Sequence, residues 1–599
     1  MSDTITREII RNRLVASTEE MAKTLIRTAF NPLLYEVQDF GVIIMSATGE
    51  MWAETPGVIV FSQGFPEAVR SGVRRWQGKF EPGDALIVND PFETGTHISD
   101  TNVYMPVFFG DELVAFCGVA AHWADVGGKN PGGWSADTTD MYQEGLCFRH
   151  QKLLRAGVMN EDIWDLIAAN VRVPSVVRGD LEAQIAACRQ GALCIQDLCG
   201  KYGIAGVEKA MREVIDSTDD AMRRAIGELP DGEYASTLRL DSDGVDPQGR
   251  FEVHLKVVVS GDRVCFNLDG TSPVARGPIN LPEVGTRGIL ASSLKGILFP
   301  FDPCNAGHTR SINFDIPPDS LVSPARPAPT DSYGYLVVAL MELTFRCLAR
   351  IVPSQCPAGG YQLTGAMFSR SAADGTPFVM ADPTHGGNGA GSAQDGPTNQ
   401  LIGNGDLPNT PVEITETRYP FRVERLEFAP EVAGAGQYRG GKGTTKEYRL
   451  LEDGICVAFI TESTEDCLAK GVDGGGDGQP GYMWIDPDTA TARRFAHRVP
   501  LLGPFKAGTL IRVTVGGGGG WGNPLKRDPE SVLRDVRNGL LSLSDARERY
   551  GVEINVEHDL AEASIDPERT NALRARVGSS VHRPTSSPGI SPRAKDVAV

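Results

Sequence analysis

The sequence predicts a multidomain α+β protein in which mixed antiparallel β-sheets pack with helices. Its 599 residues are too many for one hydrophobic core and correspond to three or four domains. Segments of alternating apolar and polar residues, typical of antiparallel strands, lie apart from long segments with helical spacing. Hydrophobic residues make up 41% and charged residues 23% of the chain, as in a soluble globular protein.

The first expected unit, residues 1–230, is an N-terminal α/β domain with a helical segment. Apolar residues recur at helical spacing over residues 5–30, and a strand with its return predicts a β-hairpin over 39–53. Helical periodicity resumes over 152–226. The turn sequence Pro-Asp-Gly at 230–232 then marks a boundary.

Four further units are expected after this boundary. Alternating residues predict a β-rich middle domain, 231–410, which ends in a long loop rich in Gly, Asn and Asp. Strands return in a C-terminal β domain, 411–525. The remainder is expected to form a helical appendage, 526–575, and a disordered tail rich in Pro and Ser, 576–599.

Composition excludes several classes of partner. The net charge of −19 argues against binding to nucleic acid, which requires a basic surface. No apolar segment approaches the roughly 18 residues that span a bilayer, and the N-terminus lacks the uninterrupted apolar stretch of a signal peptide. The 11 cysteines form no CxxC pair and indicate reduced thiols. We therefore expect a cytoplasmic protein with neither a nucleic-acid nor a membrane partner.

Two of the nine histidines lie in the same tetrapeptide frame, His97-Ile-Ser-Asp100 and His122-Trp-Ala-Asp125. Two strand-like segments between them, joined by a turn at 110–112, predict a β-hairpin. In this hairpin His122 lies opposite the residues between His97 and Asp100. Two imidazoles and a carboxylate suit zinc, manganese or iron(II) better than calcium. The alternative is an ordinary hydrogen-bonded His–Asp pair.

The glycine-rich segments do not predict a phosphate-binding loop. Residues 436–443 come close to a P-loop, but Gly443 stands where a Ser or Thr would hold Mg²⁺, and a strand-like sequence follows. The segment 474–481 lacks the strand and helix of a dinucleotide site, and the five glycines at 516–520 predict a structural turn. If the reaction needs ATP, another polypeptide is expected to bind it.

A series of short motifs extends along the chain from Ile5 to about Val552. In order they are Asp39-Phe40, Asn89-Asp90-Pro91, Gly95-Thr96-His97, AHWADVGG at 121–128, Glu144-Gly145, NTPVE at 409–413, GAGQYRGG at 434–441, GGGGGWGNP at 516–524 and ARERYG at 546–551. Together these motifs resemble the hydantoinase B/oxoprolinase family, the B-type subunits of ATP-dependent cyclic-amide hydrolases. The resemblance implies a hydantoinase B-like fold.

The resemblance also implies a site and a partner. A hydantoinase-A-like subunit of the same hetero-oligomer would bind ATP-Mg and phosphorylate the amide oxygen of the substrate. A divalent metal, zinc first with manganese or iron as alternatives, would be bound by Asp39, His97, Asp100 and His122. The acid/base candidates become Asp125, Asp90 and Glu144, each with the alternative of a hydrogen bond that only shapes a loop.

The function implied is the opening of a hydantoin, oxoproline or lactam ring, in which metal-activated water attacks the phosphorylated amide. Two departures from the usual motifs of the family leave the ring of the substrate undefined. Residues 61–66 read FSQGFP where many relatives read HLGSMP, and Asp39-Phe40-Gly41 stands where DFS is common. One alternative is the metal-binding subunit of an ATP-dependent ketone carboxylase of the acetone or acetophenone type, which would require bicarbonate. Another is a non-catalytic subunit whose metal only stabilises the fold.

Overall fold

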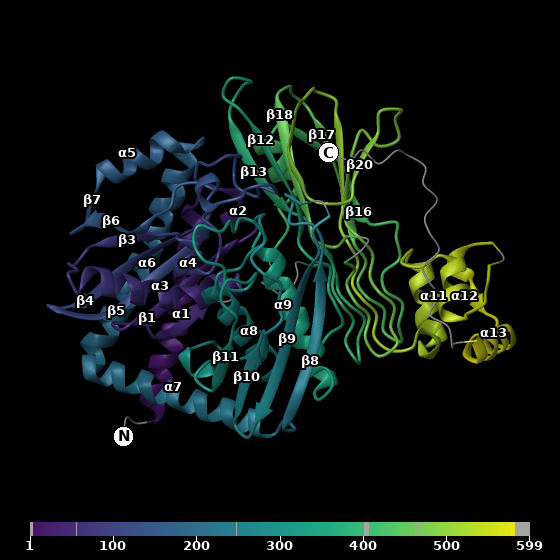
Figure 1. The fold of residues 1–599 in the computed structure, drawn as a ribbon, viewed down its shortest axis with the longest axis horizontal. Coiled ribbons are helices and arrows are strands. Elements are labelled where there is room, and N and C mark those ends of the chain that lie inside the picture. Colours follow the sequence, from purple (N-terminus) through teal and green to yellow (C-terminus); the bar gives the residue numbers. More distant parts are fainter. Residues whose placement is uncertain are drawn as a thin grey trace.

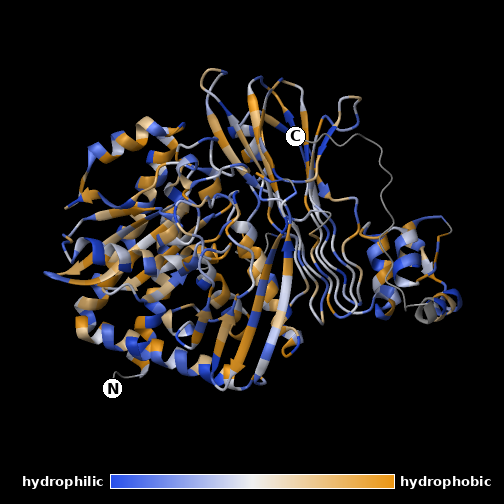
Figure 2. Ribbon diagram, viewed as in Figure 1, coloured by the Kyte–Doolittle hydropathy of each residue, from blue (hydrophilic) through white to orange (hydrophobic). Residues whose placement is uncertain are grey.

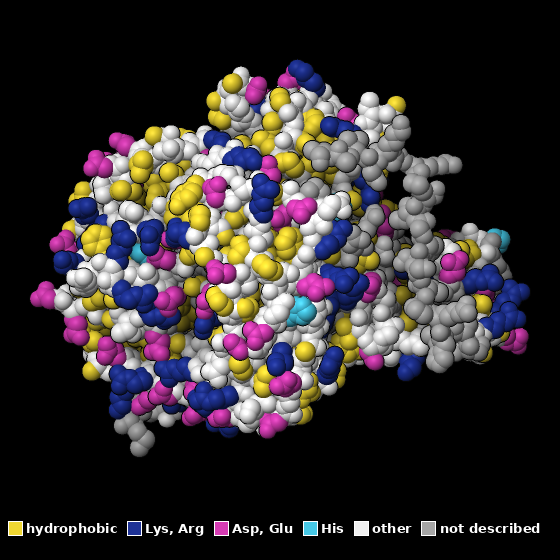
Figure 3. Space-filling model, viewed as in Figure 1, with side chains coloured by type: hydrophobic (Ala, Val, Ile, Leu, Met, Phe, Trp, Pro, Cys, Tyr) yellow, Lys and Arg dark blue, Asp and Glu magenta, His cyan; other side chains and the backbone are white. Residues whose placement is uncertain are grey.

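The computed structural model describes residues 4–55, 57–246, 248–400, 407–464, 467–556 and 558–580. Mostly antiparallel sheets and helices alternate across several packed parts (Figure 1), which confirms the predicted multidomain α+β class. None of the helices in these ranges is long and apolar enough to cross a membrane. On the face drawn in Figure 3, basic and acidic side chains are interspersed over most of the surface.

A seven-stranded sheet forms the centre of the N-terminal part, in the order β2-β1-β5-β4-β3-β6-β7. Its strands are β1 (Phe40–Ser46), β2 (Met51–Thr55), β3 (Ala85–Val88), β4 (Asp100–Phe109), β5 (Glu112–His122), β6 (Arg149–Arg155) and β7 (Val158–Met159). Residues 152–159, predicted to begin the helical segment, instead belong largely to β6 and β7, because β3 offers β6 a hydrogen-bonding edge.

Helices cover both faces of this sheet. Successive strand residues alternate between two hydrophobic cores, so Val42 belongs to one core and Ile43 to the other. The long helices α1 (Thr4–Thr28) and α6 (Pro174–Tyr202) pack on the first face, and α3 (Ile59–Trp76) packs on the second. The remaining helices of this part are α2 (Pro32–Tyr35), α4 (Pro91–Thr94), α5 (Glu161–Asn170) and α7 (Ile204–Gly227). Blue and orange residues alternate along α7 in Figure 2, as its amphipathic burial requires.

The predicted hairpin at the centre of the sheet forms, but its register differs by one residue from the expected one. Phe109 pairs with Glu112 at the turn as predicted, and a β-bulge between Val107 and Phe108 then shifts the pairing. His122 consequently lies directly opposite Asp100. The bulge therefore brings the carboxylate and the imidazole closer together than the regular register would.

A second sheet follows in the order β11-β10-β9-β8. Its strands are β8 (Gly232–Leu240), β9 (Phe251–Ser260), β10 (Arg263–Asn267) and β11 (Ile312–Asp315). The helices α8 (Glu283–Leu298) and α9 (Gly334–Leu348) lie between this sheet and α3, and one hydrophobic core extends across all of them. The turn at residues 230–232 thus separates two parts that share a core.

Two more sheets pack on each other in the C-terminal β part. One has the order β13-β12-β18-β21, with β12 (Thr364–Arg370), β13 (Phe378–Pro383), β18 (Ile455–Thr461) and β21 (Val499–Phe505). The other has the order β16-β17-β22-β19-β20, with β16 (Phe421–Phe428), β17 (Thr444–Leu450), β22 (Leu510–Thr514), β19 (Tyr482–Ile485) and β20 (Arg493–Phe495). Strands β12 and β13, expected in the middle domain, therefore pair with strands of the C-terminal domain.

Glycine-rich segments run side by side next to these sheets (Figure 1). The backbone of residues 516–520 bonds to several other segments, as in Gly518 N–H to Gly441 O (3.0 Å) and Gly519 N–H to Gly359 O (2.8 Å). The prediction of a structural turn at 516–520 is therefore wrong. Glycine is required here because backbones approach closely: a Cβ on Gly518 would lie 2.0 Å from the carbonyl oxygen of Asn388.

The remaining elements surround these glycine-rich segments. The short strands β14 (Gly386–Gly387) and β15 (Thr398–Gln400) pair within the loop predicted at 380–410, of which residues 401–406 lie outside the described ranges. Helix α10 (Val412–Arg418) precedes β16. The helical appendage contains α11 (Pro529–Arg537), α12 (Leu543–Tyr550), the strand pair β23 (Ile554–Asn555) and β24 (Ser564–Ile565), and α13 (Pro567–Ser580). Helix α13 extends past the expected boundary at 575, and the rest of the predicted tail, 581–599, lies outside the described residues.

Candidate metal centre

The chain brings two histidines and an aspartate together at one end of the β4–β5 hairpin. Asp100 is the first residue of β4, and His122 is the last residue of β5. His97 lies in the loop that leads from α4 into β4. Helix α4 ends at Gly95, whose positive φ of 81° turns the chain back toward the hairpin.

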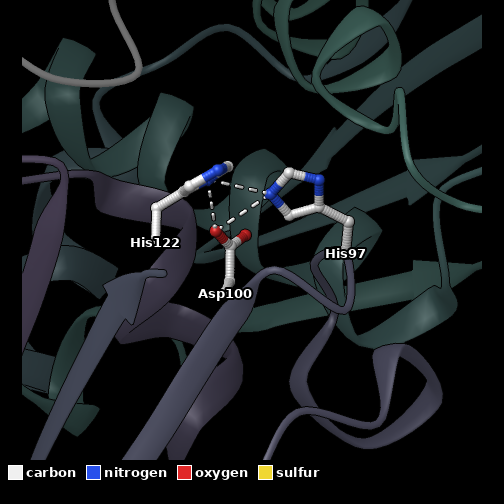
Figure 4. A group of neighbouring side chains, drawn as sticks. All are labelled: His97, Asp100 and His122. Carbon is white, nitrogen blue, oxygen red and sulfur yellow. Dashed lines mark hydrogen bonds and ion pairs between the residues drawn. The ribbon is translucent and has the colours of Figure 1, made fainter. Parts of the chain in front are cut away.

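The three side chains point toward one another (Figure 4). His97 Nε2 lies 3.0 Å from Asp100 Oδ1 and 3.2 Å from His122 Nδ1, and the last two atoms are 3.3 Å apart. Ligand atoms at about 2.1 Å from one ion are expected about 3.0–3.4 Å apart in octahedral or tetrahedral geometry. All three residues are buried, and their spacing is that of side chains that could hold one metal ion.

Asp39 lies at the more open side of this group. It directly precedes β1, and the pairing of Phe40 with Ala121 places it beside His122. Its Oδ2 is 3.8 Å from His122 Nδ1, and its side chain is 15% exposed. Burial raises the pKa of Asp39 to about 6, although His122 acts in the opposite direction. All four predicted ligands are thus brought together, with Asp39 farther away than the other three.

The start of α9 supplies hydrogen bonds to the cluster from the other side. The hydroxyl of Tyr333 donates to Asp100 Oδ2 at 3.0 Å, and His97 Nδ1 lies 3.0 Å from the carbonyl oxygen of Asp331. Because a carbonyl only accepts, His97 Nδ1 carries the proton, and Nε2 faces Asp100 and His122. Tyr333 and Asp331 were not predicted, because nothing in the spacing of the sequence connects them to residues more than 200 positions earlier.

The electrostatics of this site favour a positive charge. Burial opposes charging of His97, but the carboxylates of Asp100 and Asp331 outweigh it and raise the pKa of His97 well above its ordinary value. Burial likewise opposes ionisation of Asp100, and the two histidines overcome it and hold the pKa of Asp100 well below its usual range. Buried carboxylates that stabilise a protonated imidazole would equally stabilise a metal cation in its place.

Of the three acid/base candidates, Glu144 is connected most directly to the metal cluster. It is buried and accepts hydrogen bonds from Thr138 Oγ1 (2.9 Å) and from the backbone N–H groups of Thr330 (2.9 Å) and Asp331 (3.0 Å). Burial, with Asp331 adding to it, raises the pKa of Glu144 to about 8. Glu144 therefore supports the loop that contacts His97.

Asp125 and Asp90 are engaged in other interactions around the site. Asp125 accepts hydrogen bonds from Gly132 N–H (2.9 Å) and from the backbone and guanidinium of Arg172 (2.7 and 3.0 Å). Asp90 caps α4 and forms ion pairs with Arg326 and with Arg149 (3.1 Å). Among the described residues, the hydrogen bonds of both carboxylates go to loop backbone and arginines, not to the histidines.

Three comparisons place this architecture among known proteins. The sequence model described as Hydantoinase B/oxoprolinase matches residues 3–524. The chain is 33% identical over 591 residues to the B-type subunit of the putative D-/L-hydantoinase of Pseudomonas sp. (strain NS671), covering 96% of this chain and 98% of that one. Among solved structures it is similar to the ATP-dependent caprolactamase from Pseudomonas jessenii, with a TM-score of 0.83 and 26% identity over 96% of this chain and 99% of that one. Nucleotide-free acetone carboxylase has the same fold, with a TM-score of 0.88 at 18% identity over 96% and 83% of the two chains.

Proposed function

The chain belongs to the hydantoinase B/oxoprolinase family, and from this we propose that it is the metal-dependent subunit of an ATP-dependent cyclic-amide hydrolase. The observation that carries the proposal is the buried group of His97, Asp100 and His122, whose ligand atoms lie 3.0–3.3 Å apart. Relatives named hydantoinase and caprolactamase support cyclic amides as the substrate class.

The metal ligands in this proposal are Asp39, His97, Asp100 and His122. Two imidazole nitrogens with carboxylate oxygens fit zinc first, with manganese or iron(II) as alternatives, because these ions accept nitrogen and oxygen ligands together. When bound, such an ion activates water for attack near neutral pH. Asp331 and Tyr333 would hold His97 and Asp100 in orientation, and burial of the cluster would limit access of bulk solvent.

An acid/base residue would move protons during ring opening, and we propose that it is one of Asp125, Asp90 and Glu144. Glu144 has the strongest support, because it is buried beside the loop that contacts His97 and burial raises its pKa to about 8, nearer to neutral pH than that of an ordinary carboxyl group. Its hydrogen bonds to the backbone of Thr330 and Asp331 would also couple it to the loop that orients His97.

The amide must be activated before water can attack it, and we propose that a hydantoinase-A-like partner phosphorylates its oxygen using ATP-Mg. The names of relatives support such a hetero-oligomer: one is the B-type subunit of a hydantoinase and another the beta subunit of a caprolactamase. We place this assembly in the cytoplasm, where ATP is available and where the cysteines, which form no disulfide in the described residues, stay reduced.

The test combines this chain with a purified hydantoinase-A-like partner and measures ring opening together with ADP release. Hydantoin, 5-oxoproline and caprolactam form the substrate panel. We expect turnover of at least one ring that requires both subunits, ATP and a divalent metal. ATP hydrolysis by this chain alone would contradict the proposed division of labour.

A ketone carboxylase subunit is the second candidate, favoured by the fold shared with acetone carboxylase. Bicarbonate separates the two functions, since a carboxylase consumes it and a hydrolase does not. We expect full turnover of a cyclic amide in bicarbonate-free buffer. Acetone-dependent ADP release that appears only with bicarbonate would instead support the carboxylase.

Replacing Tyr333 by Phe tests whether Tyr333, which directly precedes α9, orients the carboxylate of Asp100. The Tyr333→Phe variant loses the hydrogen bond to Asp100 Oδ2 but keeps the buried ring, so the fold should be retained. Loss of such a bond to a metal ligand typically weakens metal affinity or activity by about 10- to 100-fold. Titration with zinc against a competing chelator measures this change. An unchanged affinity would show that Tyr333 does not orient Asp100.

A further inference from the structure

A second pair of buried charged side chains lies next to the sheet that contains β18 and β21. Glu462 directly follows β18 and is 1% exposed, and Arg498 directly precedes β21 with a side chain that is 2% exposed. Their closest atoms, Oε1 of Glu462 and Nη2 of Arg498, are 3.9 Å apart, which is too far for a hydrogen bond.

The polar atoms of this pair lack partners in the part of the chain that the structure describes. Neither carboxylate oxygen of Glu462 and neither terminal nitrogen of Arg498 has a partner at normal hydrogen-bond geometry there, although the backbone of Leu363 lies near the Glu462 carboxyl group. Buried donors and acceptors without partners are costly, and charged ones are the most costly. Such groups are rare in folded proteins and suggest that a bound molecule supplies the missing partners.

Neighbouring side chains form a defined wall beside the pair, in which Asp241 is close enough to Arg498 for the two charges to interact. The ring of Tyr335 lies 5.1 Å from the Arg498 guanidinium and covers it. The Tyr335 hydroxyl donates to one oxygen of Asp241 at 3.1 Å, and His497 Nδ1 lies 3.1 Å from the other. His497 is 52% exposed, so this wall reaches the molecular surface.

Packing contacts connect the surroundings of the pair to the metal centre. Ile460 lies on the same face of β18 as Glu462, because alternate residues of a strand share a face. Ile460 packs in one apolar cluster with Trp134, and the Trp134 ring meets the His122 ring edge-on at a centroid distance of 6.4 Å. On the other side, Tyr333 at the metal centre is only two residues from Tyr335 in the sequence.

We propose, building on the function above, that Glu462 and Arg498 form a second binding site for a cyclic amide, separate from the metal centre. Arg498 donates to the amide carbonyl oxygen, and Glu462 accepts from the amide N–H. Either protonation state of Glu462 serves, since a neutral carboxyl group still has an accepting oxygen. An ionised Glu462 would repel a ligand carboxylate, which offers it no donor.

The spacing of the pair suits an amide within a ring, which would have to displace the protein atoms that now enclose both groups. A small ring holds the amide in the cis form, so its C=O and N–H point toward the same side. From standard bond lengths, its oxygen and nitrogen lie about 2.2 Å apart. Protein atoms 3.9 Å apart can reach them if each hydrogen bond tilts outward by less than about 20°, which is within the usual angular range. The trans amides of peptides point these groups in opposite directions and do not fit.

The test is calorimetric titration of hydantoin into the isolated full-length chain without nucleotide or partner. Glu462→Met and Arg498→Met remove the polar atoms at similar volume. Each variant should raise the Kd of hydantoin at least about tenfold, because each loses one hydrogen bond to a buried charged group. Folding is checked by thermal unfolding, because removing one partner of a buried charged pair leaves the other charge unpaired and should lower Tm. The double variant Glu462→Met/Arg498→Met leaves no unpaired charge, so it should keep Tm unchanged or higher and still lose hydantoin binding. The control Arg422→Met, at an exposed ion pair on β16, should leave the Kd unchanged.

Several outcomes would overturn the proposal. One is that neither hydantoin, 5-oxoproline nor caprolactam binds to the wild-type chain. The others are that the Kd is unchanged in both methionine variants, or that acetate competes for the site as well as hydantoin does. Crystals soaked in hydantoin that show only water between Glu462 and Arg498 would also contradict it. Because this experiment needs no turnover, its failure is distinguishable from the failure of the hydrolase function, which is measured by ring opening.

Discussion

Replacing His97 by Ala will remove the metal from the protein and abolish ring opening, while the chain stays folded and still binds its partner subunit. His97 Nε2 lies within 3.2 Å of both Asp100 Oδ1 and His122 Nδ1, so its loss removes one of the three atoms that define the site. A catalytic metal contributes several kcal/mol to transition-state stabilisation, so turnover should fall by about 10³-fold or more. Metal analysis of the purified protein and ADP-coupled turnover of the reconstituted complex measure the two effects.

The same variant separates a catalytic metal from a structural one. His254→Ala is the matched control, because His254 lies on β9 with a side chain that is 38% exposed, and should keep both metal and activity. If the metal only stabilised the fold, His97→Ala would lose its cooperative unfolding transition and its association with the partner. Full turnover by a metal-free His97→Ala variant would exclude a catalytic metal at this site.

Replacing Gly518 by Ala will destabilise the C-terminal β part strongly. The added Cβ would lie 2.0 Å from the carbonyl oxygen of Asn388, and backbone cannot move aside as a flexible side chain can. Gly518 also donates to Gly441 O and accepts from Gly434 N–H, so any shift would disturb neighbouring segments as well. We expect a loss of about 3 kcal/mol or more in the free energy of unfolding, measured by denaturant titration.

Gly296 provides the control for this substitution. It lies in α8, and apart from the backbone of that helix and its chain neighbours no atom lies within 4 Å of the position that a Cβ would take there, so Gly296→Ala should be neutral or slightly stabilising. Equal stability of the Gly518→Ala and Gly296→Ala variants would show that the glycine-rich segments are not closely packed.

The metal cluster was largely predictable because His97, Asp100 and His122 lie on one hairpin or in the loop that leads into it. Strand alternation and the turn at residues 110–112 predicted that His122 lies close to Asp100. The β-bulge between Val107 and Phe108 was not predicted. A bulge depends on how the whole strand fits its neighbours, and the local sequence does not reveal it. Asp39 was known only through family resemblance, since its place depends on the pairing of β1 with β5.

The surroundings of the cluster were not predictable from spacing. Asp331 and Tyr333 reach His97 and Asp100 only because the segment before α9 lies against the loop that contains His97 in the folded chain. The glycines at 516–520 were predicted to form a structural turn, because the segments that approach them come from distant parts of the sequence. Local patterns predict elements well, whereas contacts between distant elements depend on the tertiary fold.

Anomalous diffraction from crystals of the zinc-loaded chain tests the central claim most directly. We predict one strong anomalous peak bounded by His97 Nε2, Asp100 Oδ1 and His122 Nδ1, with the Asp39 carboxylate turned toward it, at bond lengths of about 2.0–2.2 Å. A peak at any other group of side chains, or none at this one in protein that retains zinc, would contradict the account.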